Sequence, residues 1–344
     1  MSRSGSLGRI RLNRPKALNS LTLTMVRAFA AVLREFSADP QILAVLVTGE
    51  GERGLCAGGD IRALYALRDG DKSHYKTFWR EEYALNAQIA AFRKPYVVLM
   101  DGLVMGGGVG VSAHGNRRIV TERTRLAMPE TGIGFVPDVG GTWLLTRSGG
   151  GGVYMALSGA SIGGADAIHL RLADEMIHSA DIGALTDRLC AASAPDEVDS
   201  ILHDFSRSRQ QGELERHKEI LDLAMAGESV EAILVALGRF ETEFARAAIT
   251  EISRKSPTSL KVTHALLKRA VIADRLETCL ISEYRAACRL LDGPDLYEGI
   301  RAAVVDKDRA PKWSPATLAE VDDSLVLRIL EGTGDPEPEF NEGE

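Results

Sequence analysis

Short apolar runs alternate with amphipathic segments over the first 130 residues. Four runs rich in β-branched residues, each ended by turn residues, are predicted to be strands: 8–13, 43–49, 96–102 and 117–122. Between them, 22–36 and 72–92 place apolar side chains at helical spacing. Thr22 suits the start of the first helix, and Pro95 stops the second. The alternation predicts a mixed α/β core.

Beyond about residue 140 the pattern is helical, and we identify no convincing strand there. A shift in composition near residue 180 predicts a core over 1–180 followed by a helical portion over 181–328. The last segment, 329–344, is rich in acidic residues and has no basic residue after Arg328. We therefore expect it to be a solvated, mobile tail.

Composition narrows the classes of partner. The 344 residues carry 41 Lys and Arg against 48 Asp and Glu, a net charge of -7, so no general basic surface is available for nucleic acid. The 4 cysteines include no C-x-x-C pair, which suits a reducing compartment. No apolar run has the length of a signal peptide or of a membrane span. We expect a cytoplasmic protein with no membrane partner.

Two glycine-rich segments are candidates for ligand contact. In GLCAGGDI (54–61) the small residues Ala57, Gly58 and Gly59 let backbone N–H groups approach a ligand. Asp60 is predicted to cap the helix that follows. The alternative to ligand contact by this segment is a plain glycine turn before that helix. In DGLVMGGGVGVSAHG (101–115) a strand leads into three glycines and an apolar helix, which again exposes N–H groups.

The second segment also fits two weaker alternatives. Gly108, Gly110 and Ala113 match the dinucleotide pattern G-x-G-x-x-A, but no crossover helix returns to a strand as that fold requires. Ser112 resembles a nucleophile elbow, but His114 stands where the elbow needs glycine. We therefore interpret Ser112 as a packed residue.

Carboxylates stand in two unusual settings. Glu130 and Asp138 each follow a proline in an apolar, glycine-rich segment, where poor solvation raises a carboxylate pKa toward the range useful for acid/base catalysis. Helix capping is the alternative for both. Glu81 and Glu82 stand among aromatic residues in FWREEYALN (78–86), where a solvated helix face is the simpler explanation.

Taken together, the motifs resemble a known family. NRPKALNSL, GLCAGGDI, DGLVMGGGVG and MPETGIGFVPDVGGTWLL, in this order, are similar to the crotonase (enoyl-CoA hydratase/isomerase) superfamily. The resemblance continues through REEYALN, KSPTSLK (255–261) and DLYEGIRAAVVDKDRAPKW (295–313), although the N-terminus is short for the first strand. It implies an α/β fold, a crotonase-type spiral of ββα units with a helical C-terminal portion.

The resemblance also implies an acyl-CoA ligand. The N–H groups of Gly59 and Gly107 would form an oxyanion hole around the thioester carbonyl oxygen. Ala57 and the stretch from Lys16 to Asn19 would meet the adenine end of CoA, largely through the backbone. Superfamily members often form trimers through C-terminal helices, but the helical portion here could instead fold back over its own core.

Within the superfamily, hydratases use two glutamates. Here the first position is Gly110 and only the second, Glu130, remains, which is similar to the hydrolase members. The resemblance implies hydrolysis of 3-hydroxyisobutyryl-CoA in valine breakdown, with Glu130 attacking the thioester or activating water. Asp138 would contact the 3-hydroxyl and assist proton transfer, and Glu82 would line the substrate pocket.

No metal and no cofactor beyond the CoA of the substrate are implied. Two alternatives stay open, an enoyl-CoA hydratase or isomerase and a non-catalytic acyl-CoA-binding protein. Selectivity for 3-hydroxyisobutyryl over 3-hydroxypropionyl groups is also open.

Overall fold

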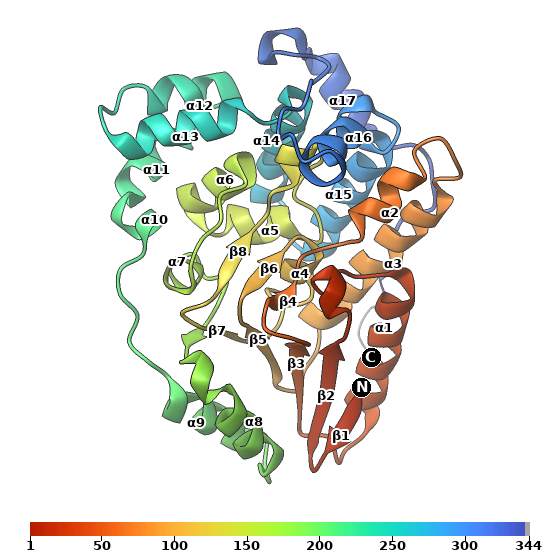
Figure 1. Cartoon of the computed structure of the whole chain (residues 1–344), viewed down its shortest axis with the longest axis vertical. Helices are drawn as coiled ribbons and strands as arrows, with labels where there is room; N and C mark the ends of the chain where they lie inside the picture. The colour runs from red at the N-terminus through yellow and green to blue at the C-terminus, as the bar shows by residue number, and fades with distance from the viewer. Residues whose placement is uncertain (341–344) are drawn as a thin grey trace.

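The strands form two sheets, as the computed structural model, which describes residues 1–340, shows (Figure 1). The larger sheet has the order β1-β2-β3-β5-β7-β9, and only the β1/β2 pair is antiparallel. Its strands are β1 (Ser2–Ser4), β2 (Leu7–Leu12), β3 (Ala44–Gly49), β5 (Tyr96–Met100), β7 (Arg117–Val120) and β9 (Glu175–Met176). The smaller sheet is parallel and consists of β4 (Gly54–Cys56), β6 (Leu103–Met105) and β8 (Arg125–Ala127).

The two sheets are built from a repeated unit. Each of β3, β5 and β7 belongs to the larger sheet and is followed at once by a strand of the smaller one. Helices follow the second strand of the first two units: α2 (Ile61–Ala66) and α3 (Ser73–Ala90) after β4, and α4 (Gly107–Gly110) after β6. This confirms the predicted spiral of ββα units.

The predicted elements of the core are present. The four predicted strands correspond to β2, β3, β5 and β7, and the two predicted helices to α1 (Leu23–Ala38) and α3. Thr22 caps α1, since its hydroxyl accepts a hydrogen bond from the N–H of Met25. The prediction of no strand beyond residue 140 is wrong at β9, whose two residues are too short for a period to be visible.

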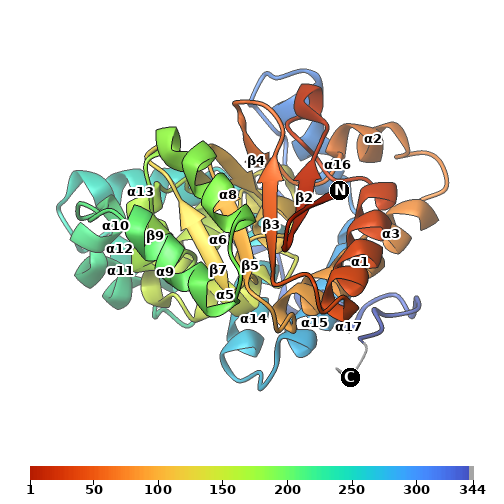
Figure 2. The same ribbon diagram turned by 90° about the horizontal axis from the view of Figure 1, so that it is seen from below.

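Helices cover both faces of the larger sheet, as the view in Figure 2 makes clear. On one face, α8 (Ile182–Cys190) and α9 (Asp196–Phe205) bury branched aliphatic side chains against β2, β3, β5 and β7. The opposite face joins the main hydrophobic core, to which α1, α3 and the later helices contribute. Those later helices are α5 (Gly141–Thr146), α6 (Gly149–Ser158), α7 (Gly164–His169), α10 (Glu213–Arg216), α11 (Lys218–Ala224), α12 (Val230–Leu237), α13 (Glu243–Ser253), α14 (Pro257–Val271), α15 (Leu276–Leu290), α16 (Pro294–Ile300) and α17 (Asp323–Glu331).

The helical portion folds back over its own core. Helix α14 packs against α5, and α15 packs against both α3 and α5, so buried side chains of 181–328 share one cluster with those of 1–180. This is the fold-back arrangement that the sequence left open. The division into domains and self-association stay predictions. In the part of the chain that the structure covers, no helix is both long enough and apolar enough to cross a bilayer.

The acidic tail, whose expected mobility stays a prediction, makes contacts with distant helices. Residues 329–331 end α17, and beyond them Asp335 pairs with Lys76 of α3 at 2.7 Å. Glu337 pairs with Arg285 of α15, and Arg289 donates a hydrogen bond to the carbonyl of Gly332. These basic partners lie on helices far from the tail in the sequence, so the composition of the tail alone could not indicate them. Glu342 and Glu344 lie outside the described residues.

Candidate active site

Two glycine turns meet at the carboxyl ends of β4 and β6. Because these strands are parallel neighbours, the segments that leave them run side by side. A Cβ added at Gly58 would lie 3.6 Å from the N atom of Gly107. Gly106 has φ 51, a left-handed conformation that favours glycine. The fold therefore brings together the turns that carry the two predicted donors, Gly59 and Gly107.

The N–H groups of these donors are unengaged. Among residues 1–340, neither Gly59 nor Gly107 donates a hydrogen bond from its backbone nitrogen, although Gly107 is buried. Buried N–H groups almost always find a partner, so free ones at a turn are suited to a ligand oxygen. Their role as an oxyanion hole stays a prediction.

Helix α3 supplies Glu82 to this turn. Consecutive helical residues point about 100° apart, so Glu81 reaches the surface, where it pairs with Arg27, while Glu82 turns inward. Glu82 is 2% exposed, and its Oε1 lies 2.5 Å from the position of a Cβ at Gly107. That oxygen has no hydrogen-bond partner among residues 1–340. The expectation of a solvated face thus holds for Glu81 and not for Glu82.

Glu130 also approaches this turn. It opens a short 3-10 helix, Glu130–Ile133, directly after β8 and Pro129. Its Oε1 lies 3.0 Å from the position of a Cβ at Gly106, and its Oε2 is buried with no hydrogen-bond partner in the described part of the chain. Two carboxyl groups, those of Glu82 and Glu130, therefore face adjacent glycines of one turn.

Asp138 joins them from the loop before α5. It is buried, and its Oδ2 accepts a hydrogen bond from the hydroxyl of Tyr83 on α3 at 2.7 Å. Neither Asp138 nor Glu130 caps a helix with its side chain, which removes the capping alternative for both. The next residue, Val139, has its carbonyl oxygen 2.7 Å from Nε2 of His114.

A fourth carboxyl was missed by sequence reasoning. Glu283 of α15 is fully buried and accepts hydrogen bonds from the backbone nitrogens of Gly140 at 2.7 Å and Thr142 at 2.9 Å, and from the hydroxyl of Thr142. The one available signal was its place at helical spacing with the buried residues Cys279, Leu280 and Ala287. Nothing local connected it to a loop 143 residues earlier.

Burial raises the pKa of all four carboxyl groups. Desolvation raises the pKa of Glu82 and Glu130 well above the ordinary range, and the nearby charge of Asp138 adds to both shifts. Desolvation raises the pKa of Asp138 to about 7, opposed by the hydrogen bond from Tyr83, and that of Glu283 to about 8, opposed by the bonds from Thr142 and Gly140. Within residues 1–340 none of the four forms an ion pair. Groups that titrate near neutral pH suit proton transfer.

The position that carries the first hydratase glutamate is closed. A Cβ at Gly110 would lie 2.7 Å from Cβ of Val139 and 2.7 Å from Nδ2 of Asn86. Distances below about 3.0 Å require atoms to move, so a glutamate would not fit unless this wall shifted.

The residues predicted to meet the adenine end of CoA lie at the first turn. Lys16 is exposed on the 3-10 helix Pro15–Ala17. Asn19 is buried, and its amide is used internally: it accepts from the N–H of Arg14 and donates to the carbonyls of Glu50 and Gly54. Ala57 donates its N–H to the carbonyl of Leu18. Contact with CoA through Lys16, Asn19 and Ala57 stays a prediction. The groups of this turn that could contact CoA are backbone carbonyls and the side chain of Lys16.

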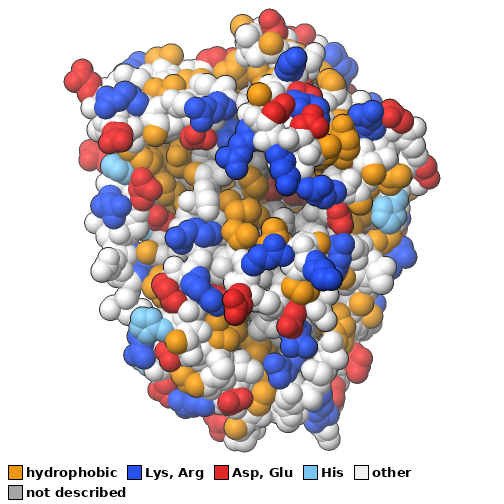
Figure 3. All heavy atoms as spheres, in the orientation of Figure 1, with side chains coloured by type: hydrophobic (Ala, Val, Ile, Leu, Met, Phe, Trp, Pro, Cys, Tyr) orange, Lys and Arg blue, Asp and Glu red, His pale blue; other side chains and the backbone are white. Residues whose placement is uncertain are grey.

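A second segment with exposed basic residues lies near this turn. Arg62 of α2 donates to the carbonyl of Val304, which places the π-helix Arg301–Val305 beside the helix that follows Gly59. After it, Lys307 and Arg309 are exposed. Figure 3 shows Lys and Arg side chains on both sides of a hollow on the face seen in Figure 1.

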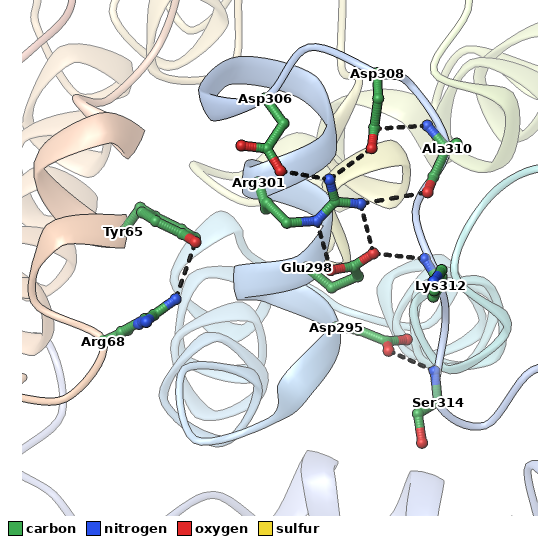
Figure 4. Close-up of polar contacts among 10 residues, drawn as sticks. All are labelled: Tyr65, Arg68, Asp295, Glu298, Arg301, Asp306, Asp308, Ala310, Lys312 and Ser314. Carbon is green, nitrogen blue, oxygen red and sulfur yellow. Dashed lines mark hydrogen bonds and ion pairs between the residues drawn. The ribbon is translucent and has the colours of Figure 1, made fainter.

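Arg301 organises the loop that carries these two residues (Figure 4). Its guanidinium donates two hydrogen bonds to Glu298 and further ones to Asp306 and Asp308. The N–H of Lys312 also donates to Glu298. The acidic residues of the loop are thus used to hold its shape, and Lys307 and Arg309 are left for solvent or ligand.

A groove of about 1150 Å³ lies elsewhere, between α1, α3 and residues 339–340. Its lining includes Arg27, Glu81, Gln88 and Phe340, and none of the predicted site residues. We place the candidate site at the glycine turns because the buried carboxyl groups converge there.

Comparison with known proteins gives the family. A family model described as enoyl-CoA hydratase/isomerase matches residues 7–330. The mitochondrial 3-hydroxyisobutyryl-CoA hydrolases of Rattus norvegicus and Bos taurus are 37% and 38% identical, each over 99% of this chain and 90% of theirs. Those two relatives are named mitochondrial, so the comparison does not support the predicted cytoplasmic location.

Solved structures with the same fold carry other names. A carnitinyl-CoA dehydratase from Mycobacterium thermoresistibile is 44% identical with a TM-score of 0.94, covering 99% of this chain and 98% of that one. An enoyl-CoA hydratase from Rhodobacter sphaeroides 2.4.1 is 38% identical with a TM-score of 0.90, covering 98% of each chain. The chain therefore belongs to the enoyl-CoA hydratase/isomerase family, the crotonase superfamily that its four motifs resemble.

Proposed function

We propose that the protein is an acyl-CoA thioester hydrolase that converts 3-hydroxyisobutyryl-CoA and water into 3-hydroxyisobutyrate and CoA. The observation that carries the proposal is that buried Glu130 faces a glycine turn with the charge of buried Asp138 nearby, while Val139 fills the space at Gly110. A single superfamily glutamate suits attack on a thioester better than addition of water across a double bond, which uses two. The curated relatives named as hydrolases support the same choice.

The glycine turns would stabilise the charge that develops during attack. With the thioester carbonyl oxygen between the N–H groups of Gly59 and Gly107, both donors meet the oxyanion of the tetrahedral intermediate. Loss of one such donor typically costs about 2.7 to 4 kcal/mol of barrier. The segment that bears Lys307 and Arg309 would serve the phosphates of CoA, since exposed basic side chains attract anions.

In its ionised form, Glu130 would drive the attack in one of two ways. As a base it takes a proton from water while the water oxygen bonds to the carbonyl carbon, after which the carbon–sulfur bond breaks and the thiolate receives a proton. As a nucleophile its carboxylate displaces the thiolate and forms an anhydride, which water then cleaves to restore Glu130. Trapping with hydroxylamine separates the two routes, because only the anhydride yields a modified Glu130 by mass spectrometry.

Asp138 would recognise the acyl group and move a proton. Tyr83 occupies its Oδ2, which leaves Oδ1 for the 3-hydroxyl of the substrate. A pKa raised to about 7 would let Asp138 carry a proton at neutral pH and give it to the departing thiolate.

The decisive experiment measures thiol release from 3-hydroxyisobutyryl-CoA with a thiol-reactive dye. Release that depends on enzyme concentration supports hydrolysis, because neither hydration nor simple binding liberates CoA. Acyl-CoA binding without thiol release and without any change in the acyl group would support a non-catalytic binding protein. Parallel assays with 3-hydroxypropionyl-CoA and isobutyryl-CoA measure how strictly the acyl group is selected.

A hydratase is the second candidate, because Glu82 and Glu130 face adjacent glycines of one turn and could flank one water. The names of the two solved structures point the same way. This activity would consume the double bond of a 2,3-unsaturated acyl-CoA without releasing thiol. Under it, Glu82→Gln abolishes turnover as completely as Glu130→Gln, whereas a hydrolase keeps its dependence on Glu130 and loses less with Glu82→Gln.

A further inference from the structure

We propose that Glu283 and His114 are positioning residues, which orient Asp138 by holding the strained turn at residues 138–140 in place. The inference rests on the proposed function, since it takes Asp138 to act on the substrate. It adds two residues from outside the motif that contains Asp138, one of them on the helical C-terminal portion.

The turn is strained at Val139. This residue has φ 54, in the left-handed region that β-branched residues rarely adopt, and Gly140 follows with φ 78. Such a conformation persists only where the surroundings fix it, and it is commonest at functional sites. The two positive φ angles change the direction of the backbone between Asp138 and α5.

Glu283 fixes the backbone after the strained residue. Its carboxyl group accepts hydrogen bonds from the nitrogens of Gly140 and Thr142, so both oxygens are used on the segment that enters α5. The hydroxyl of Thr142 adds a third bond. Helix α15 therefore anchors the turn through Glu283.

His114 fixes the strained residue itself. The carbonyl of Val139 can only accept, so Nε2 of His114 carries the proton of the 2.7 Å hydrogen bond. Desolvation lowers the pKa of His114 to about 4, so the ring is neutral at neutral pH and keeps this donor. The ring also packs on Gly140, where an added Cβ would lie 2.6 Å from Nε2.

The orientation of the Asp138 side chain is thus fixed by contacts from three parts of the chain. Tyr83 of α3 holds its side chain, while His114 and Glu283 hold the backbone that follows. The charge of Asp138 in turn raises the pKa of two neighbouring carboxyl groups, those of Glu82 and Glu130. Loss of either backbone anchor lets Val139 relax toward an ordinary conformation and moves Asp138 away from the substrate.

The test is a double-mutant cycle on thiol release from 3-hydroxyisobutyryl-CoA. We expect Glu283→Gln to lower kcat at least about tenfold with KM changed less than about threefold. The reason is that a displaced Asp138 no longer makes its interaction with the transition state. In the Asp138→Asn background the same substitution should lower kcat less than about threefold, since residues that act through one another are not additive.

Asp166 provides a matched control. It is another buried carboxylate that accepts hydrogen bonds from two backbone nitrogens at a helix start, those of Glu213 and Glu215 of α10. Asp166→Asn should lower Tm and leave kcat within about threefold of the wild type. A Glu283→Gln enzyme that behaves like Asp166→Asn, or that loses the same factor in both Asp138 backgrounds, would overturn the proposal.

His114 supplies a second test if Glu283→Gln does not fold. His114→Gln keeps an N–H donor near the position of Nε2 and should retain kcat within about threefold, whereas His114→Leu should lose at least about tenfold. Equal activity of these two variants would contradict the role of the hydrogen bond.

If Asp138→Asn itself leaves kcat unchanged, the role of Asp138 in the proposed function fails and the inference fails with it. A cycle without coupling removes the inference alone.

Discussion

Within residues 1–340 one buried oxygen of Glu130 has no hydrogen-bond partner and the other lies 3.0 Å from the position of a Cβ at Gly106, so no hydrogen bond ties its carboxyl group to the fold there. This distinguishes it from Glu283, whose two oxygens are both used by backbone donors. Substitution of Glu130 should therefore affect chemistry more than stability.

We predict that Glu130→Gln lowers kcat for thiol release at least about a hundredfold while acyl-CoA binding is retained, because the amide cannot accept the proton or attack the thioester. Turnover is measured with a thiol-reactive dye and binding by calorimetry. Glu81→Gln is the control, since its carboxylate pairs with Arg27 at the surface. Near-normal thiol release by Glu130→Gln would exclude Glu130 from the reaction.

We predict that Asp138→Asn lowers kcat/KM far more for 3-hydroxyisobutyryl-CoA than for isobutyryl-CoA, which lacks the hydroxyl. A buried site built to bind a hydroxyl loses most when that pairing is disturbed. The ratio of the two specificity constants is the measurement. Equal losses on both substrates would mean that Asp138 serves the thioester chemistry common to both.

At the scale of elements, the absence of a side chain at Gly107, in the turn after β6, lets side chains of other segments lie against its backbone. A methyl group at Gly107 would meet Oε1 of Glu82 at 2.5 Å and Cδ1 of Leu21 at 3.1 Å. At Gly59 the nearest atom would be an ordinary contact with Phe78 at 3.5 Å. The two predicted donors therefore differ in how much they tolerate a side chain.

We predict that Gly107→Ala lowers kcat at least about tenfold, because Glu82 must move away from the turn, while Gly59→Ala stays within about threefold of the wild type. Both variants keep the backbone N–H, so the comparison isolates the effect of the added methyl group. Steady-state thiol release measures it. A Gly107→Ala enzyme as active as Gly59→Ala would show that the space beside Gly107 is not needed.

The sequence predicted the elements and residues whose signals are local. The strands β2, β3, β5 and β7 are long enough to show a pattern, and Glu130 and Asp138 stand in short motifs with prolines and glycines. Strand β9 has two residues, too few for a period. Glu283 acts on a loop 143 residues away, and Lys76 holds Asp335 from a distance of 259 residues, so only the folded chain shows these contacts.

At the scale of the whole molecule, the four buried carboxyl groups couple stability to pH. The pKa of Asp138 is raised from 3.8 to about 7 and that of Glu283 from 4.5 to about 8, so between these limits the folded chain binds more protons than the unfolded chain. The free energy of unfolding contributed by these groups is therefore fully present below about pH 4 and falls as pH rises through about 8.

We predict that the urea midpoint of the wild type falls between pH 5 and pH 8.5, and that Asp138→Asn, whose side chain stays neutral, falls less steeply. Asp199→Asn is the control, because Arg117 lowers the pKa of Asp199 and the effect of this pair is confined to more acidic pH. A slope unchanged by Asp138→Asn would contradict the raised pKa of that group.

The absence of any ion pair to the four carboxyl groups within residues 1–340 also bears on the direction of the proposed reaction. The acyl group of the substrate enters the site as an uncharged thioester and, after hydrolysis, would carry a negative charge in a buried site that offers it no cation. An anion that leaves water without gaining a partner of opposite charge pays a large desolvation cost. The site would thus expel its own acid product, which hinders the reverse reaction and inhibition by 3-hydroxyisobutyrate, while uncharged acyl chains remain free to enter.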